Sequence, residues 1–178
     1  MADPSVRGVL LVGGASTRFG SPKALARFRG ESFAERAYRL LDEAFGEPIV
    51  VGKAADALPL PFPVHDDGHD HRAAIVGVAA GLRLAGSELA VVVPTDMPFL
   101  TVEFLQELVE AAEGVDVAAP ETGPLPGAYR PSALPVLERH IADRSFTLHR
   151  ALEGLDVAIV HGNLELLRNV NTLADLPV

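Results

Sequence analysis

The chain has 178 residues, of which 48% are hydrophobic and 22% charged, and its formal net charge is −9. This size fits one globular domain over residues 1–178. The acidic balance argues against broad nucleic-acid binding, and no apolar run approaches the roughly 18 residues of a membrane helix. The chain has no cysteine and therefore no disulfide or thiolate metal site. We expect a soluble, cytoplasmic monomer with neither nucleic acid nor membrane as a partner.

Short apolar runs alternate along the chain with segments of helical periodicity. Ser32 and Glu35 have the spacing of a capping box, and Thr101 suits the N-cap of a later helix. In chain order, we predict a strand at 9–12, a helix at 32–45, a strand at 49–51, a loop at 58–63, a short strand ending at His65, a helix at 74–85, a strand at 89–93, a helix from Thr101 to about 112, a strand at 117–119, helices from about 132 and 146, and a strand at 157–160.

Strands that alternate with helices predict an α/β fold whose mostly parallel sheet has helices on both faces. The run at 89–93 is apolar throughout, as expected of a strand that is covered on both sides. In such sheets, ligands bind beyond the carboxyl ends of the strands. This rule selects the loop after Val12 and the loop after Val93.

The first of these loops is glycine-rich and basic. It reads Gly-Gly-Ala-Ser-Thr-Arg-Phe-Gly-Ser-Pro-Lys over 13–23. Paired glycines let the backbone approach a phosphate and offer N–H donors, while Arg18 and Lys23 add positive charge. The spacing matches neither a P-loop nor a dinucleotide fingerprint. The alternative is a glycine-rich turn with solvated charges.

The second loop contains Thr-Asp-Met-Pro-Phe over 95–99. A carboxylate at the end of a central strand, here Asp96, can hold magnesium beside a bound nucleotide, because this ion takes one or two carboxylates with phosphate oxygens and water. Asp96 could instead cap a turn before Pro98. The stretch 65–71 is dense in His and Asp but fits no recurrent zinc spacing, so we predict a solvated loop there and single out only Asp66.

Both loops, together with Asn-Val-Asn-Thr at 169–172, resemble the MobA family of molybdenum cofactor guanylyltransferases. The resemblance covers nearly the whole chain and implies a three-layer, Rossmann-like nucleotidyltransferase fold. It also implies transfer of GMP from GTP to molybdopterin bearing molybdenum, with release of pyrophosphate and with Mg²⁺ as the cofactor. Other proteins of the molybdenum pathway would be candidate partners.

The resemblance assigns roles to residues of this chain. Asp96 would be the metal ligand, and with Lys23 and Arg18, which we expect from their charge to neutralise phosphates, it would make up the catalytic residues. The nucleotide contacts would be Leu11, Val12, Gly13, Gly14, Lys23, Asp66 and Asp96. Asn169 and Asn171 would line the floor of the active site or the acceptor pocket, although Asn171-Thr172 could instead cap a last helical turn with Asp175.

Three positions depart from the family pattern. Ala73-Ala74-Ile75-Val76-Gly77 replaces Gly-Pro-Leu-Ala-Gly, Gly52 replaces an Asn, and Pro22 precedes Lys23 where Asp is usual. Pro22 is as in the related cytidylyltransferases, whereas Gly13-Gly14 resembles the guanine-using branch. The alternatives are a cytidylyltransferase or other cofactor nucleotidyltransferase, and a non-catalytic adaptor of the same fold.

Overall fold

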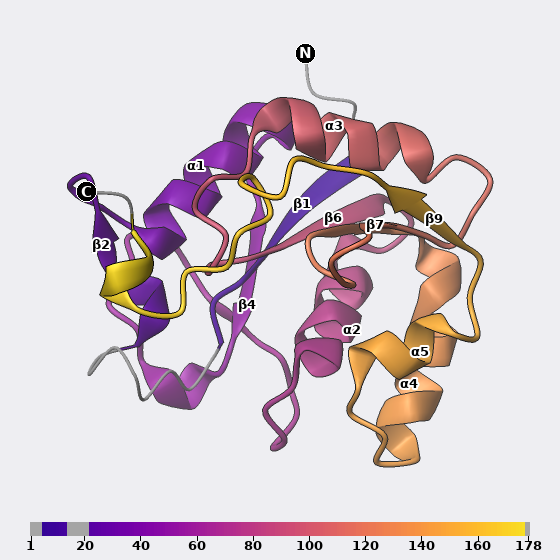
Figure 1. The fold of residues 1–178 in the computed structure, drawn as a ribbon. Helices are drawn as coiled ribbons and strands as arrows, with labels where there is room; N and C mark the ends of the chain where they lie inside the picture. The colour runs from indigo at the N-terminus through magenta and orange to yellow at the C-terminus, as the bar shows by residue number, and fades with distance from the viewer. Residues whose placement is uncertain (1–4, 14–21, 177–178) are drawn as a thin grey trace.

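The computed structural model describes residues 5–13 and 22–176. Their central feature is a seven-stranded sheet in the order β5-β4-β1-β6-β8-β7-β9 (Figure 1). Its strands are β1 (Val6–Leu11), β4 (Ile49–Gly52), β5 (His65–Asp66), β6 (Leu89–Pro94), β7 (Val117–Pro120), β8 (Gly127–Tyr129) and β9 (Val157–Val160). A separate hairpin consists of β2 (Arg27–Phe28) and β3 (Glu31–Ser32).

Among the described strands of the large sheet, β8 alone runs against the others. β1 pairs in parallel with β4 and β6, β4 with β5, and β7 with β9. β8 lies antiparallel between β6 and β7. The prediction of a mostly parallel sheet is therefore confirmed, whereas β8 was not foreseen. Its three residues are too few to show a periodicity.

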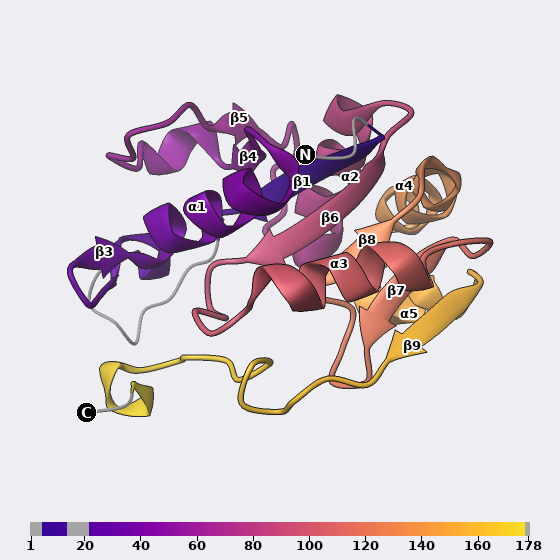
Figure 2. The ribbon, with the colours of Figure 1, turned by 90° about the horizontal axis from the view of Figure 1, so that it is seen from above.

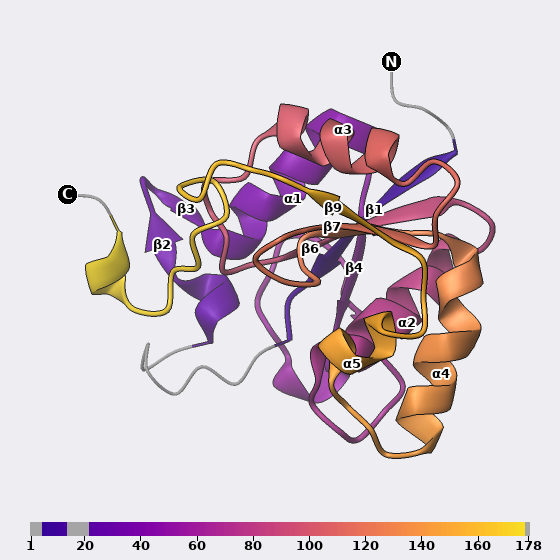
Figure 3. The ribbon, with the colours of Figure 1, turned by 45° about the vertical axis from the view of Figure 1, so that its right-hand side comes forward.

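Helices cover both faces of the sheet (Figures 1 and 2). One face carries α1 (Phe33–Phe45) and α3 (Val102–Ala111), and the other carries α2 (Ala74–Ala85), α4 (Leu134–Ala142) and α5 (Leu148–Leu152), which Figure 3 shows together below the sheet. Short 3-10 helices are η2 (Lys23–Leu25), η3 (Ala54–Asp56), η4 (Pro131–Ala133) and η5 (Leu173–Asp175). No described helix has the length and apolar character needed to cross a bilayer.

Alternation along β1 produces the two cores. Leu10 packs with α1 and α3, whereas its neighbours Val9 and Leu11 pack with α2, because successive strand residues point to opposite faces. All three are buried. A smaller cluster joins Val170, near the end of the chain, to Phe28 and Phe33. The last segment is thereby held against the β2–β3 hairpin and the start of α1.

Most predicted boundaries agree with the structure. α2 has the predicted bounds, and α1 begins after Ser32, whose side chain forms the predicted capping box with Glu35. Thr101 Oγ1 accepts from Phe104 N, as expected of an N-cap.

The short strand predicted to end at His65 instead begins there and pairs with Val51 and Gly52. The preceding segment, 58–63, is rich in proline, which has no N–H for a strand ladder.

Candidate functional site

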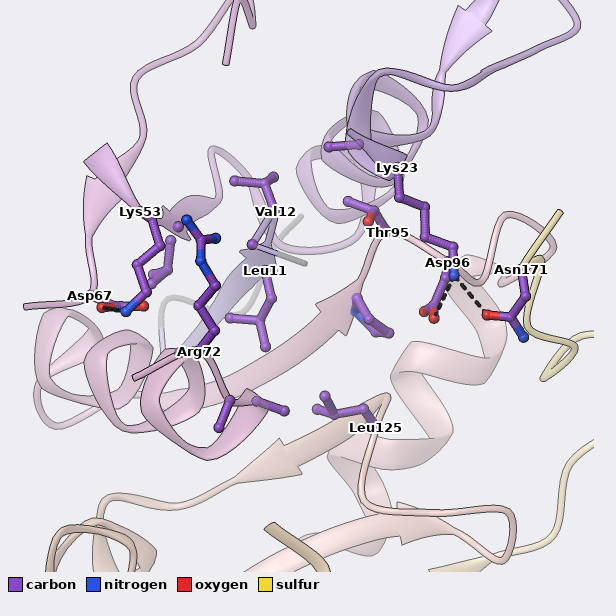
Figure 4. Close-up of a pocket in the computed structure, with 18 residues that line it drawn as sticks. Leu11, Val12, Lys23, Lys53, Asp67, Arg72, Thr95, Asp96, Leu125 and Asn171 are labelled. Atoms are coloured by element: carbon purple, nitrogen blue, oxygen red, sulfur yellow. Dashed lines mark hydrogen bonds and ion pairs between the residues drawn. The ribbon is translucent and has the colours of Figure 1, made fainter. Parts of the chain in front are cut away.

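A cleft of about 650 Å³ opens at the edge of the sheet where the parallel strands end. Leu11, Val12 and Gly13 line it from the end of β1, and Thr95 and Asp96 line it just beyond β6. Figure 4 shows two groups of polar side chains facing one another across it. The position follows the rule that ligands bind beyond the carboxyl ends of parallel strands.

The first group joins three segments that are far apart in the sequence. Lys23 Nζ lies 3.2 Å from Asp96 Oδ2 and 2.9 Å from Asn171 Oδ1 (Figure 4). Lys23 begins η2, Asp96 lies two residues beyond β6, and Asn171 lies in the last segment of the chain. All three were selected from the sequence, and all three line the cleft.

Asn171 is positioned by its backbone on both sides. Val170 N donates to Asp96 O at 2.7 Å, and Asn171 N donates to Asp175 Oδ2 at 2.9 Å. Asp175 also accepts from Thr172 N, so it caps the final turn, and these backbone bonds lower the pKa of its carboxyl. Asn171 can therefore take part in the capped turn and also line the active site, because the turn uses its backbone N–H while its side chain accepts from Lys23. Asn169 is exposed and does not line the cleft.

The second group lies beyond β4 and β5. Lys53 Nζ lies 2.8 Å from Asp67 Oδ1 and 3.0 Å from the carbonyl of His71, and it also donates to the carbonyl of His69. About nine-tenths of each charged side chain is buried. The chain contains two lysines, Lys23 and Lys53, and both line this cleft.

Asp66 is placed differently from its neighbour Asp67. Its carboxylate accepts from Ala54 N at 2.6 Å and from Gly68 N at 2.8 Å, outside the lining of the cleft, and these bonds lower its pKa. Asp67, which sequence reasoning passed over, lines the cleft. Consecutive residues at a strand end face opposite ways. Asp67 therefore faces the cleft, whereas Asp66, one position earlier, hydrogen-bonds to the backbone of neighbouring turns.

Arg72 is a third lining residue that the sequence analysis missed. Its guanidinium makes a two-pronged ion pair with Asp56, and that hydrogen bonding holds the pKa of the Asp56 carboxyl below its usual range. Lys53 and Asp67 follow β4 and β5, and Arg72 leads into α2. Applying the strand-end rule to β4 and β5, as well as to β1 and β6, would have selected the first two.

Two glycines let elements approach closely behind the cleft. A Cβ on Gly52 would lie 2.8 Å from Val12 Cγ2, and one on Gly77 would lie 3.1 Å from Leu11 Cδ2. Gly52 stands where the family commonly has Asn. In this chain Val12 packs against the space that such a side chain would need.

Gly14, predicted to contact the nucleotide, and Arg18, predicted to be catalytic, lie outside the described residues. Within the described part of the chain, no three His, Cys, Asp or Glu side chains are grouped so as to hold a metal ion. Asp96 is the carboxylate that adjoins Lys23 in the cleft.

Residues 8–159 match the MobA-like NTP transferase domain. The chain belongs to this family. It is 33% identical to the probable molybdenum cofactor guanylyltransferase of Rhodopirellula baltica, over 98% of this chain and 92% of that protein. The resemblance stated from the sequence is thus confirmed.

Solved structures agree with this assignment. The fold matches that of molybdopterin-guanine dinucleotide biosynthesis protein A from Archaeoglobus fulgidus with a TM-score of 0.82 and 28% identity, over 95% of this chain and 94% of that one. It also matches the 2-C-methyl-D-erythritol 4-phosphate cytidylyltransferase of Thermus thermophilus, with a TM-score of 0.68 and 18% identity over 90% of each chain. The second likeness concerns the fold alone. The predicted Rossmann-like nucleotidyltransferase fold is confirmed.

Proposed function

We propose that this protein transfers GMP from GTP to molybdopterin bearing molybdenum, forming the guanine dinucleotide cofactor and releasing pyrophosphate. The observation that carries the proposal is the meeting of Lys23, Asp96 and Asn171 in the cleft of a MobA-family fold. The names of its relatives support the choice of nucleotide and acceptor. Retention of this cluster also argues against a non-catalytic adaptor.

The reaction needs no covalent enzyme intermediate. An oxygen of the acceptor phosphate attacks the α-phosphorus of GTP, and the bond to the β-phosphate oxygen breaks, so that pyrophosphate leaves with the bonding pair. The protein contributes positioning and charge neutralisation, as in other phosphoryl-transfer sites. We assign the neutralising role to Lys23, with Arg18 and the backbone of Gly13 and Gly14 holding the triphosphate.

The donor set around Asp96 fits magnesium that arrives with the nucleotide. Magnesium in nucleotide sites is commonly held by one or two carboxylates, while phosphate oxygens and water complete its coordination. Asp96 is one such carboxylate, and the described residues contain no group of three or more His, Cys, Asp or Glu that could hold a metal ion. When bound, the ion would polarise phosphoryl oxygens and neutralise their charge. Lys23, 3.2 Å from Asp96, balances the charge of this carboxylate in the free protein.

Base recognition fits the end of β1. Val12 N donates to Val51 O at 2.9 Å, so the first backbone donor beyond the strand pairing belongs to Gly13. Guanine presents a carbonyl, a ring N–H and an amino group, which backbone groups and the carboxylate of Asp67 can pair. A site that pairs such groups rejects a base that lacks them, because its own polar groups would be left without partners.

The test is a transfer assay with purified protein, molybdopterin bearing molybdenum and GTP, CTP or ATP, with and without Mg²⁺. We expect GTP to exceed CTP and ATP by at least about tenfold in kcat/KM. Asp96→Ala should abolish transfer while the circular dichroism spectrum stays unchanged, since metal polarisation supplies several kcal/mol. Asp143→Ala, an exposed aspartate outside the cleft, is the matched control.

Each contrary outcome has a definite meaning. Equal or better use of CTP would show that the protein is a cytidylyltransferase, which is the hypothesis that Pro22 and Gly52 favour. Binding of partner proteins without transfer from any nucleotide would favour the adaptor. Near wild-type turnover by a folded Asp96→Ala variant would remove Asp96 from the metal site.

A further inference from the structure

The antiparallel strand β8 brings a loop from the second half of the sheet to the cleft. Gly127, at the start of β8, pairs with Val92 near the carboxyl end of β6. Because β8 runs against its neighbours, the residues before it emerge at the edge where the parallel strands end. One of them, Leu125, is half-buried and points into the cleft (Figure 4).

The strand order arranges the lining residues in a row. From β5 to β8, the cleft presents Asp67 and Lys53, then Gly13 after β1, then Asp96 after β6, and then Leu125 before β8. In the proposed reaction, GTP occupies Gly13, Lys23 and Asp96. Leu125 comes just before β8, which lies on the far side of β6 from β1, β4 and β5. Since GTP is assigned to residues at the ends of β1 and β6, the side of the cleft at β8 is left for the acceptor, whose phosphate oxygen attacks in line with the departing pyrophosphate.

Leu125 is held in place from its own loop. The hydroxyl of Tyr129, a residue that is 0% exposed, donates to the carbonyl of Pro124 at 2.6 Å. A Cβ on Gly127 would lie 2.7 Å from that same carbonyl oxygen and 2.7 Å from the Tyr129 ring. Burial also raises the pKa of Tyr129 far above its usual range, so the hydroxyl stays a donor. The backbone on both sides of Leu125 is therefore fixed.

We propose that Leu125 is a contact for the acceptor, offering an apolar surface to its fused heterocyclic ring system, and that Tyr129 is a positioning residue that acts through Pro124. The inference rests on the proposed function, because it names which substrate the second half of the cleft receives. A preorganised apolar side chain suits a rigid fused ring system, since little conformational entropy is lost when the rings dock.

The experiment varies each substrate in turn at saturating levels of the other, using the full chain. Leu125→Asn keeps the approximate size but makes the side chain polar, and we expect the KM for the acceptor to rise about tenfold while the KM for GTP changes less than about twofold. Leu125→Met should stay near wild type. Tyr129→Phe should raise the KM for the acceptor several-fold. Leu164→Asn, at a leucine that is 65% exposed and outside the cleft, is the control.

Calorimetric GTP binding by each variant shows that the nucleotide side of the cleft is intact. Because Leu125 is only half-buried, we expect its variants to fold. They therefore test the inference even if the Tyr129→Phe variant does not fold. An unchanged KM for the acceptor, or an equal rise in the KM for GTP, would overturn the inference while the proposed function stands. If the wild-type protein transfers no GMP to the acceptor, the proposed function fails, and the inference fails with it.

Discussion

Lys23 and Lys53 line the same cleft but are bound differently. Lys53 directs its ammonium to a carboxylate and two backbone carbonyls of one loop, 67–71. Lys23 bridges two side chains, Asp96 and Asn171, on separate segments. An ammonium has three donors on a flexible stem. Lys53 therefore holds one wall of the cleft, whereas Lys23 can exchange side-chain partners for phosphate oxygens when GTP enters.

Lys23→Met is expected to weaken GTP binding and to slow transfer. A charge-assisted hydrogen bond contributes about 1.5–3 kcal/mol, so the Kd for GTP should rise at least about tenfold. Isothermal titration calorimetry measures it, with Arg150→Met, an exposed cation on α5 outside the cleft, as the control. Unchanged affinity together with an unchanged rate would place Lys23 outside the phosphate site.

At this scale, the sequence predicts residues that belong to a motif and misses those that depend on neighbouring strands. Lys23 and Asp96 were selected because they lie in loops that follow predicted strands, and Asn171 because its motif resembles a family. Lys53 and Asp67 also follow predicted strands, but they line this cleft because β4 and β5 lie beside β1, and the order of strands in the sheet depends on tertiary pairing. The roles given to all of the site residues stay predictions, those of Lys23, Asp96 and Asn171 included.

The capping box at the start of helix α1 is a short sequence pattern that stabilises the whole helix. Ser32 Oγ accepts from Glu35 N at 3.1 Å, and Glu35 Oε2 accepts from Ser32 N at 2.9 Å. These bonds satisfy backbone donors that a helix N-terminus leaves without partners, and they lower the pKa of Glu35. The helix then buries Phe33, Ala37 and Leu41 against the sheet and the hairpin.

Ser32→Ala should destabilise the protein by about 1 kcal/mol, the usual cost of losing an N-cap. Ser32 is buried, so water does not readily replace the lost acceptor. Urea unfolding followed by circular dichroism measures the change, and Ser87→Ala, at an exposed turn position, should leave the free energy of unfolding unaltered. Equal stability of the two variants would show that the capping box contributes nothing to the folded state.

Element length decides what sequence reasoning recovers. α1, α2 and β6 are long enough for periodicity and caps to be read, and each was predicted closely. The hairpin β2–β3 has two residues in each strand and β8 has three. Such strands exist because of tertiary pairing, which overrides local propensity. One of these missed strands, β8, is the one that carries Leu125 to the cleft.

At the scale of the whole molecule, seven carboxylates among the described residues have pKa values below the usual range. Each is bonded in the folded state to an arginine, a hydroxyl or a backbone N–H. They are Glu31, Glu35, Asp56, Asp66, Glu103, Asp116 and Asp175. Several of them join separate segments: Asp56 pairs with Arg72 at the cleft, and Asp116 accepts from Ser132 Oγ and from Asp156 N. Charge on these groups therefore helps to hold the ends of elements together.

The sign of the resulting pH dependence follows from linkage. A carboxyl whose pKa is lower in the folded state stabilises that state fully above its unfolded pKa of about 4, and it loses this contribution as the pH falls through the folded value. We therefore expect the free energy of unfolding in urea to decline from about pH 4 downward. Asp116→Asn removes one such group and should give a shallower decline than wild type. Wild-type stability at pH 3 equal to that at pH 7 would contradict the prediction, because the carboxylates would then take up protons equally in both states.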